Sequence, residues 1–319
     1  MLKTISYNIL IFFVLANVLY WSIPAVTSIS DLIRGKRDGG GREFRSFLGW
    51  RSPPRPTVND NTKGDRKVYF FGGSTMWGLG SPESYTIPSL FAASTGMPSE
   101  NHGEIGYTSH QGLVLLLQLL QSGHRPALVI FYDGVNDVAI KCEQGMTPES
   151  HGEEREIRTL LRGSVSPGSF SHYFKPVIRL AERINVQISK ALLISKYDCD
   201  TDAKKAEAIA DNLIRDWQFA KLLTESRGGK FIGILQPVSY FSKTRLDHLK
   251  LPPGLDRQYQ TVYPLIREKI ARSGEFHDLV SALDVDENIY TDFNHITPKG
   301  NELIARKIVE IAGPTAAAR

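Results

Sequence analysis

Short apolar runs alternate with longer helical patterns over most of this 319-residue chain. The runs at 67–71, 127–132 and 230–235 are almost continuously apolar, which is typical of strands buried on both faces of a parallel sheet. The helical patterns follow at 109–122, 202–227, 259–272 and from Thr297-Pro298 onward. Strands that alternate with helices imply right-handed crossovers. We therefore predict a three-layer α/β/α sandwich with a mostly parallel, flavodoxin-like sheet.

Leucine spacing and capping residues support the helical assignments. In the segment 109–122, Leu113, Leu116, Leu117 and Leu120 fall at i, i+3, i+4 and i+7, so they share one face. At the last helix, a threonine hydroxyl can cap the first turn, and proline suits the first helical position. The stretch 138–201 does not fit the alternation, and neither does the proline-containing loop 246–258.

Ser74 lies directly after the first predicted strand, in the segment Phe71-Gly72-Gly73-Ser74-Thr75. Glycines allow the backbone to turn sharply there. A helix that begins at this point offers unpaired N–H groups and positive dipole charge to an oxyanion. A serine in this position is poised to act as a nucleophile, although the same tetrapeptide is also an ordinary strand-to-helix turn.

Three further blocks of polar residues lie at the edges of predicted elements. They are Asn101-His102-Gly103-Glu104-Ile105-Gly106-Tyr107, Gly134-Val135-Asn136-Asp137 and Asp292-Phe293-Asn294-His295. Each block alone is compatible with a turn. Together they supply a base, an orienting carboxylate and extra oxyanion donors. Because ligands of parallel sheets bind beyond the carboxyl ends of the strands, we expect Ser74, Asn136 and the loop Gln236-Pro237-Val238 to share one rim.

The four blocks resemble those of the SGNH hydrolase superfamily, also called GDSL esterases and lipases, of the membrane-anchored bacterial envelope type. The resemblance extends from about Lys67 to Ile311. It implies a catalytic triad formed by Ser74, His295 and Asp292. It also implies an oxyanion hole made by the N–H groups of Ser74 and Gly106 and by the side-chain amide of Asn136.

The sequence departs from the family pattern in two places. Gly72-Gly73 stands where the family usually has Gly-Asp before the serine, and that aspartate is generally not the triad member. The polar stretch 99–102 stands where the family usually has an apolar strand.

The resemblance implies a serine esterase or acylhydrolase that cleaves an oxygen ester through an acyl-enzyme. The expected substrate is a carbohydrate O-acetyl group or a short acyl ester, on a small molecule or a glycan. An O-acyltransferase acting on cell-surface polysaccharide would use the same triad, and the sequence does not separate the two. A non-catalytic glycan-binding protein is a third alternative, which the complete triad disfavours.

Two aromatic residues near the blocks are candidates for substrate binding. Trp77 follows Ser74 by three residues and is a candidate wall of an acyl pocket, and Tyr107 adjoins the second block. Both residue types are also common in cores. Asp133 and Asp137 flank the third block, but the spacing lacks other metal ligands, so we expect turn or network roles for them. No metal and no cofactor are expected.

Residues 1–29 form a predicted transmembrane anchor or signal segment. The stretch 5–29 is almost free of charge and long enough to cross a bilayer, so we expect an uncleaved anchor. Six Lys or Arg residues between Arg34 and Arg51 follow it, whereas only Lys3 and the amino terminus precede it. The positive-inside rule then opposes export, but large domains translocate despite charge. We expect a membrane-anchored protein with an extracytoplasmic, periplasmic domain.

The remaining predicted segments are a flexible basic and proline-rich tether at 30–65, a hydrolase domain at 66–313 and a disordered tail at 314–319. The stretch 138–201 is interpreted as an insertion with helices at 155–162 and 176–195, which is either a lid over the site or a plain structural excursion. The net charge is +4, without arginines and lysines interleaved with aromatics, so no nucleic-acid partner is expected.

Cys142 and Cys199 are the two cysteines of the chain, and they flank this insertion. A disulfide between them would close the insertion at its base, and it would fit an exported domain. Two free thiols are the equally favoured alternative.

Overall fold

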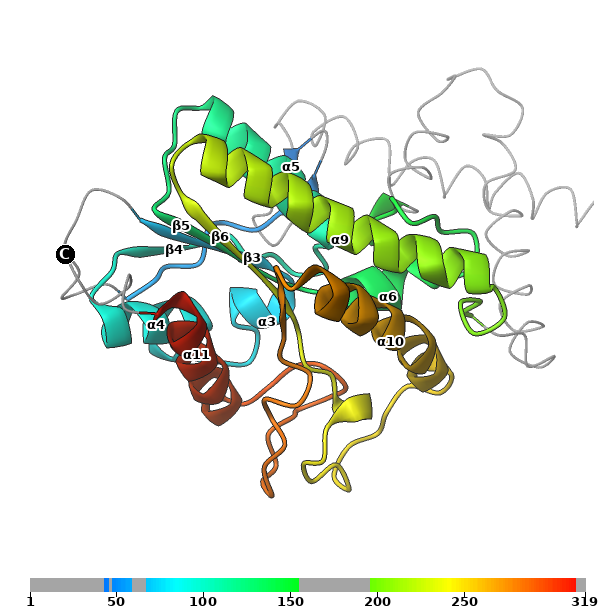
Figure 1. Cartoon of the computed structure of the whole chain (residues 1–319). Coiled ribbons are helices and arrows are strands. Elements are labelled where there is room, and N and C mark those ends of the chain that lie inside the picture. Colours follow the sequence, from blue (N-terminus) through cyan, green and yellow to red (C-terminus); the bar gives the residue numbers. More distant parts are fainter. Residues whose placement is uncertain (1–42, 46–47, 59–66, 155–195, 314–319) are drawn as a thin grey trace, which may run out of the picture. The chain divides into compact units, whose positions relative to one another are not determined.

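The computed structural model describes residues 43–45, 48–58, 67–154 and 196–313 (Figure 1). The chain divides into two units. One comprises Met1–Arg45, Gly49–Arg51 and Glu153–Ser195, and the other Ser46–Leu48, Ser52–Gly152 and Lys196–Arg319. In the first unit, β1 (Glu43–Arg45) pairs antiparallel with β2 (Gly49–Arg51). The main sheet lies in the second unit.

Several predicted segments lie outside the described residues: the anchor at 1–29, most of the tether, the helices at 155–162 and 176–195, and the tail at 314–319. Within the described ranges, no helix combines the length and the apolar character needed to cross a membrane.

The main sheet has five strands in the order β4-β3-β5-β6-β7. These are β3 (Val68–Gly72), β4 (Ser99–Asn101), β5 (Leu128–Asp133), β6 (Lys230–Leu235) and β7 (His277–Asp278). Every neighbouring pair is parallel. In chain order the strands run 2-1-3-4-5, which is the flavodoxin-like arrangement. The predicted parallel sheet is confirmed.

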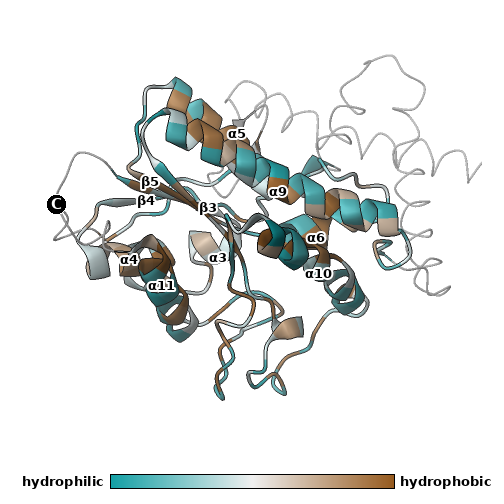
Figure 2. Ribbon diagram, viewed as in Figure 1, coloured by the Kyte–Doolittle hydropathy of each residue, from teal (hydrophilic) through white to brown (hydrophobic). Residues whose placement is uncertain are grey.

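Helices cover both faces of this sheet, as Figure 1 shows for α5 and α9 on one side and α4 and α11 on the other. The helices of the second unit are α3 (Ser74–Trp77), α4 (Ile87–Thr95), α5 (Ser109–Gln121), α6 (Val135–Lys141), α9 (Ala203–Ser226), α10 (Leu255–Ser273) and α11 (Pro298–Ala312). Successive strand residues point to opposite cores: Phe71 and Phe131 pack with α5 and α9, whereas Phe70 and Ile130 pack with α4 and α11. Strands β3 and β5 are therefore apolar on both faces, and their ribbons are largely brown in Figure 2.

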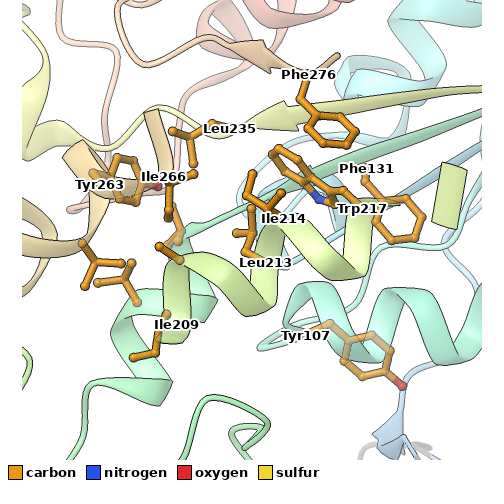
Figure 3. Close-up of a cluster of buried hydrophobic side chains, with 14 of the residues drawn as sticks. Tyr107, Phe131, Ile209, Leu213, Ile214, Trp217, Leu235, Tyr263, Ile266 and Phe276 are labelled. Carbon is orange, nitrogen blue, oxygen red and sulfur yellow. The ribbon is translucent and has the colours of Figure 1, made fainter. Parts of the chain in front are cut away.

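Trp217 extends from α9 into the buried core, where Figure 3 shows it beside Phe131 and Phe276. Its ring lies 5.2 Å from the ring of Phe276, centroid to centroid. It also lies against the backbone of β6, because a Cβ at Gly233 would come within 2.9 Å of the indole. The indole Nε1 donates a hydrogen bond of 3.0 Å to Asp133 at the end of β5. This contact connects the core to the rim that holds the candidate site.

Residues 99–101 of the polar stretch form β4, only three residues long, which pairs with β3. It is polar because Asn101 binds the backbone around it. The Asn101 side chain donates to the carbonyl of Met76 at 3.0 Å and accepts from the N–H of Gly103 at 3.0 Å. A polar side chain thereby fixes the loop after β4 to the helix that begins with Ser74.

Most predicted helices have the expected positions, including α5, α9 and α11 with its Thr297 cap. Helix α10 begins at Leu255, earlier than the predicted residue 259, so the loop from 246 is shorter than expected. Gly254 precedes this helix with φ +79°, a conformation that glycine adopts without strain. Helix α4 and the short strand β7 were not predicted, and β7 has only two residues.

Cys142 and Cys199 form a disulfide, which decides between the two alternatives left open by the sequence. The chain on either side of it is also paired. The N–H of Gln144 donates to the carbonyl of Lys196, and the N–H of Asp198 donates to that of Cys142, both at 3.0 Å. The disulfide and these two hydrogen bonds therefore hold the segments around Cys142 and Cys199 side by side.

Residues 52–58 belong to the predicted tether, yet they are part of the second unit and make specific contacts within it. The guanidinium of Arg55 donates to the carbonyl of Gly78 at 2.7 Å and also to that of Ser81. The same group lies 4.6 Å from the centre of the Trp77 ring. The N–H of Val58 donates to the hydroxyl of Ser89 at 3.1 Å.

Candidate active site

Ser74 is the first residue of α3, directly beyond the end of β3, and only 5% of it is exposed. The two glycines before it are required by close neighbours. A Cβ at Gly72 would lie 2.6 Å from the carbonyl oxygen of Tyr132, and a Cβ at Gly73 would lie 2.3 Å from Nδ2 of Asn136. A side chain at position 73 would therefore displace the amide of Asn136.

Ser74, His295 and Asp292 are brought together in one hydrogen-bonded chain. Oγ of Ser74 lies 2.6 Å from Nε2 of His295, although 221 positions separate them in sequence. Nδ1 of the same ring lies 2.6 Å from Oδ2 of Asp292. A hydroxyl, an imidazole and a carboxylate in this order can activate the hydroxyl as a nucleophile.

The turn Asp292–His295 fixes its own geometry. Oδ1 of Asp292 accepts the N–H of Asn294 at 2.9 Å and that of His295 at 2.8 Å, while Oδ2 binds the ring. Burial opposes ionisation of this carboxyl, but the hydrogen bonds from His295 and the backbone outweigh it and hold the pKa of Asp292 below its usual range. Asp292 is therefore an ionised acceptor that orients the imidazole.

The second and third blocks meet beside Gly73. Nδ2 of Asn136 donates to the carbonyl of Tyr107 at 2.8 Å. A side-chain amide has two N–H donors, so this bond orients Asn136 and leaves its second N–H for a ligand. Gly106 has φ +78°, and its N–H meets no acceptor within the part of the chain that the structure describes. These donors are suited to a developing oxyanion.

Glu104 anchors the loop that carries Gly106. Its N–H donates to the carbonyl of Gly72 at 3.0 Å, which joins the loop to the end of β3. Its carboxylate is buried, with 2% of the residue exposed, and accepts the N–H of Ser52 at 2.6 Å and the hydroxyl of Ser52 at 2.8 Å. The same carboxylate accepts the N–H of Ile105 at 3.1 Å.

A buried ion pair supports helix α6, which carries Asn136. Nζ of Lys141 lies 2.7 Å from Oδ1 of Asp137, and the two side chains are 0% and 1% exposed. Lys141 also donates to Asn212 on α9 at 2.7 Å. The Ser109 hydroxyl lies 2.7 Å from Asp137 and 2.8 Å from Asp216. This network joins α5, α6 and α9 behind the site.

The two aspartates that flank the third block have opposite protonation tendencies. Burial favours the neutral form of Asp137, but Lys141 and the hydrogen bonds from Ser109 outweigh it and lower the pKa of Asp137. Burial, together with the charge of Asp137, raises the pKa of Asp133 well above its usual range. Both residues thus belong to a structural network, as expected from the sequence. Within the described residues, no group of three or more His, Cys, Asp or Glu could hold a metal ion.

The two aromatic candidates for substrate binding are engaged by other parts of the second unit. Tyr107 is 3% exposed and packs in the core beneath α5 and α9, and its carbonyl is what orients Asn136. Trp77 is half-buried, with the guanidinium of Arg55 over its ring. Substrate contact by either ring stays a prediction.

Sequence reasoning missed Thr75 and Gln236 as members of the site. Both are 3% exposed and adjoin the triad, and they are hydrogen-bonded to each other. The only sequence signal was that Gln236 follows a strand that ends at the same rim as Ser74. Because each polar side chain alone is typical of a turn, their contact is not evident before the chain is folded.

No protein-family model matches the chain, and no curated protein matches it either. Solved structures do match. A member of the lipolytic protein G-D-S-L family from Veillonella parvula is 14% identical, with a TM-score of 0.46, over 77% of this chain and 98% of that one. A carbohydrate acetylesterase family member from Sinorhizobium meliloti is 15% identical, with a TM-score of 0.43, over 79% and 99%. An acetyl xylan esterase is 17% identical, with a TM-score of 0.42, over 76% and 97%. These likenesses are distant, so we base the function on the site itself.

Proposed function

We propose that this protein is a serine hydrolase of the SGNH type that cleaves oxygen esters through an acyl-enzyme. One observation carries the proposal: Ser74, His295 and Asp292 form a continuous chain with two contacts of 2.6 Å. A buried serine hydroxyl bound to an imidazole that is itself bound to an ionised carboxylate has the arrangement required for nucleophilic catalysis.

Acylation begins when Nε2 of His295 removes the proton from Oγ of Ser74, which attacks the ester carbonyl carbon. The carbonyl oxygen becomes negative in the tetrahedral intermediate. The N–H groups of Ser74 and Gly106 and the second N–H of Asn136 stabilise that charge. The imidazolium, stabilised by Asp292, then gives its proton to the leaving alcohol oxygen. The carbon–oxygen bond breaks, and the acyl group stays on Ser74.

Deacylation repeats these steps with water. His295 takes a proton from water, the resulting hydroxide attacks the acyl carbon, and the proton returns to Oγ of Ser74 as the carboxylic acid leaves. A sugar hydroxyl in place of water would give O-acyl transfer with the same residues. The expected acyl donors are carbohydrate O-acetyl groups or short acyl esters, because the resemblance to this superfamily implies them.

We also propose that the domain works outside the cytoplasm, anchored by the segment at 1–29. The disulfide between Cys142 and Cys199 supports this location, since such bonds persist in oxidising compartments. Protease treatment of intact cells tests it: an extracytoplasmic domain is digested once the outer barrier is permeabilised, and a cytoplasmic one is protected.

Labelling with a fluorophosphonate probe tests the chemistry, because the probe reacts with activated serines. We expect modification of Ser74 in the full-length protein and none in Ser74→Ala. Ser226→Ala is the control, because this serine lies at the exposed end of α9 and, among the described residues, its hydroxyl donates only to the carbonyl of Leu223. Turnover of an acetylated glycan, with and without a glycan acceptor, then separates hydrolysis from transfer. If the protein shows neither labelling nor turnover, the third alternative, a non-catalytic glycan-binding protein, remains.

A further inference from the structure

A relay of two buried side chains links the segments that carry the nucleophile and the base. Nε2 of Gln236 donates to Oγ1 of Thr75 at 2.9 Å, and Oγ1 of Thr75 donates to the carbonyl of Asn294 at 3.3 Å. Thr75 is the neighbour of Ser74 on α3, and Asn294 is the neighbour of His295. The relay therefore runs beside the contact between the two reacting side chains.

The direction of each bond in the relay is fixed by chemistry. An amide nitrogen can only donate and a carbonyl oxygen can only accept, whereas a hydroxyl can do both. Only a hydroxyl at position 75 can accept from Gln236 and donate to Asn294 at the same time. Serine would preserve this capacity, and valine, which has the same shape as threonine, would remove it.

Gln236 is itself held on both sides of its backbone. Its N–H donates to the carbonyl of Asp133 at 2.8 Å, and its carbonyl accepts the hydroxyl of Tyr263 at 3.0 Å. Three residues later, the N–H of Ser239 donates to the carbonyl of Phe293 at 2.9 Å. The loop after β6 thus supports the triad turn from a rigid base.

The hydrogen bond between Asp292 and His295 does not by itself fix the distance between His295 and Ser74. Asp292 orients the imidazole of His295, but both belong to the same turn, so Asp292 cannot set the distance from that turn to Ser74. That distance depends on hydrogen bonds between the turn and other elements, among them one of 3.5 Å from Nε2 of Gln236 to the carbonyl of Asn294. The hydroxyl of Thr75 makes such a bond, one residue away from each reacting partner.

We propose that Thr75 and Gln236 are positioning residues that hold His295 at proton-transfer distance from Ser74. This inference rests on the proposed function. In the described part of the chain, neither side chain is hydrogen-bonded to the reacting atoms; Thr75 acts through the carbonyl of Asn294, and Gln236 acts through the hydroxyl of Thr75. Small displacements of catalytic groups reduce the rate of chemistry more than substrate binding, so the effect falls on kcat.

The test compares Thr75→Val, Thr75→Ser and Gln236→Met with the wild-type protein. Thr224→Val is the matched control, because Thr224 is also fully buried and its hydroxyl also donates to a backbone carbonyl, at 2.7 Å, on α9. The readouts are kcat and KM for a chromogenic acetyl ester, the rate of fluorophosphonate labelling, and the folded fraction. The downfield proton NMR signal of the His295 ring N–H bound to Asp292 gives a readout that does not depend on turnover.

We expect Thr75→Val and Gln236→Met to lower kcat and the labelling rate by about tenfold with little change in KM, as loss of roughly one hydrogen bond implies. Thr75→Ser should stay within about twofold of the wild type, because it keeps the hydroxyl. The NMR signal should broaden in Thr75→Val and persist in Thr75→Ser. Thr224→Val should change stability only.

The proposal is overturned if Thr75→Val matches the wild type in kcat and NMR signal, or if Thr75→Ser is as slow as Thr75→Val. It is also overturned if the rate falls only with the folded fraction. A wild-type protein that the probe does not label at Ser74 would instead refute the proposed function. In that case the NMR comparison still decides whether Thr75 orders the turn of His295.

Discussion

Asn136 lies so close to Gly73 that a Cβ at position 73 would be 2.3 Å from its amide nitrogen. A side chain at position 73 would therefore overlap the amide of Asn136, which is the proposed side-chain donor of the oxyanion hole. The aspartate usual in the superfamily does not fit there unless Asn136 moves.

We predict that Gly73→Ala displaces Asn136 and lowers kcat by about a hundredfold, comparable to the loss of one oxyanion donor. The same substitution should cost little further activity in an Asn136→Ala background, because the clash is then absent. Gly123→Ala is the control: a Cβ there meets nothing within 4 Å, although φ is +92°. It should reduce stability and leave kcat unchanged. Equal effects of Gly73→Ala in both backgrounds would contradict the prediction.

The proposed oxyanion donor and the triad carboxylate should differ in their effects. Asn136→Ala is expected to reduce kcat by about a hundred- to a thousandfold. His295→Ala should abolish turnover, whereas Asp292→Asn should retain a measurable remainder, because His295 stays in place but loses its orienting charge. Steady-state kinetics on a short acyl ester measures all three. Full activity in His295→Ala would exclude the proposed base.

Removing one partner of the buried ion pair Lys141–Asp137 should destabilise the protein more than removing both charges. We expect Lys141→Met to destabilise the protein by about 3–5 kcal/mol, because it leaves a buried carboxylate without its partner. The double variant Lys141→Met/Asp137→Asn should recover part of this loss, since no uncompensated charge remains. Urea denaturation measures both. A double variant less stable than Lys141→Met would show that Asp137 contributes chiefly through its other bonds, to Ser109 and Gly134.

Glu100 on β4 should make stability depend on pH at acidic values. Its hydrogen bond with His102, aided by Lys67 and opposed by burial, lowers the pKa of Glu100 to about 2. The unfolded value is about 4.3. A carboxyl with a lowered folded pKa stabilises the protein above the unfolded pKa, and this contribution is lost as pH falls through the folded pKa. The stability difference between wild type and Glu100→Gln should therefore be constant near neutrality and shrink between about pH 4 and 2. Chemical denaturation across this range checks it, and a constant difference would contradict it.

The disulfide should stabilise the folded protein mainly by restricting the unfolded chain. Cys142 and Cys199 are 57 positions apart, and a loop of this size implies about 3–4 kcal/mol in the loop-entropy picture. Cys142→Ser, Cys199→Ser and the double variant should all lose a similar amount, because each removes the same bond. Denaturation under non-reducing conditions measures it. Losses that add in the double variant would point to packing of the separate thiols instead.

The β-strands of the sheet and the long helices could be predicted because their signals are local. Continuous apolar runs identified β3, β5 and β6, and periodic leucines identified α5. Where a contact overrides the local pattern, prediction was weaker. Strand β4 is polar because Asn101 binds the backbone of α3, and the beginning of α10 depends on the left-handed Gly254.

For the site, the sequence provided the residue types and placed Ser74 and Asn136 beyond the ends of strands. Ser74, Gly106, Asn136, Asp292 and His295 were all identifiable from the four blocks. The contact between Ser74 and His295 depends on how β3 and the last loop come together, across 221 positions. The pairing of the two cysteines and the relay through Thr75 and Gln236 were undetermined for the same reason.

The sequence by itself thus determined the alternation of strands and helices and the chemical inventory of the rim, because hydrophobic periodicity and turn chemistry act over a few residues. Only the tertiary structure decided which polar groups meet, which glycine lacks room for a side chain, and which side chains support the triad. Those choices depend on distances between segments far apart in the chain, and packing of the two cores sets these distances.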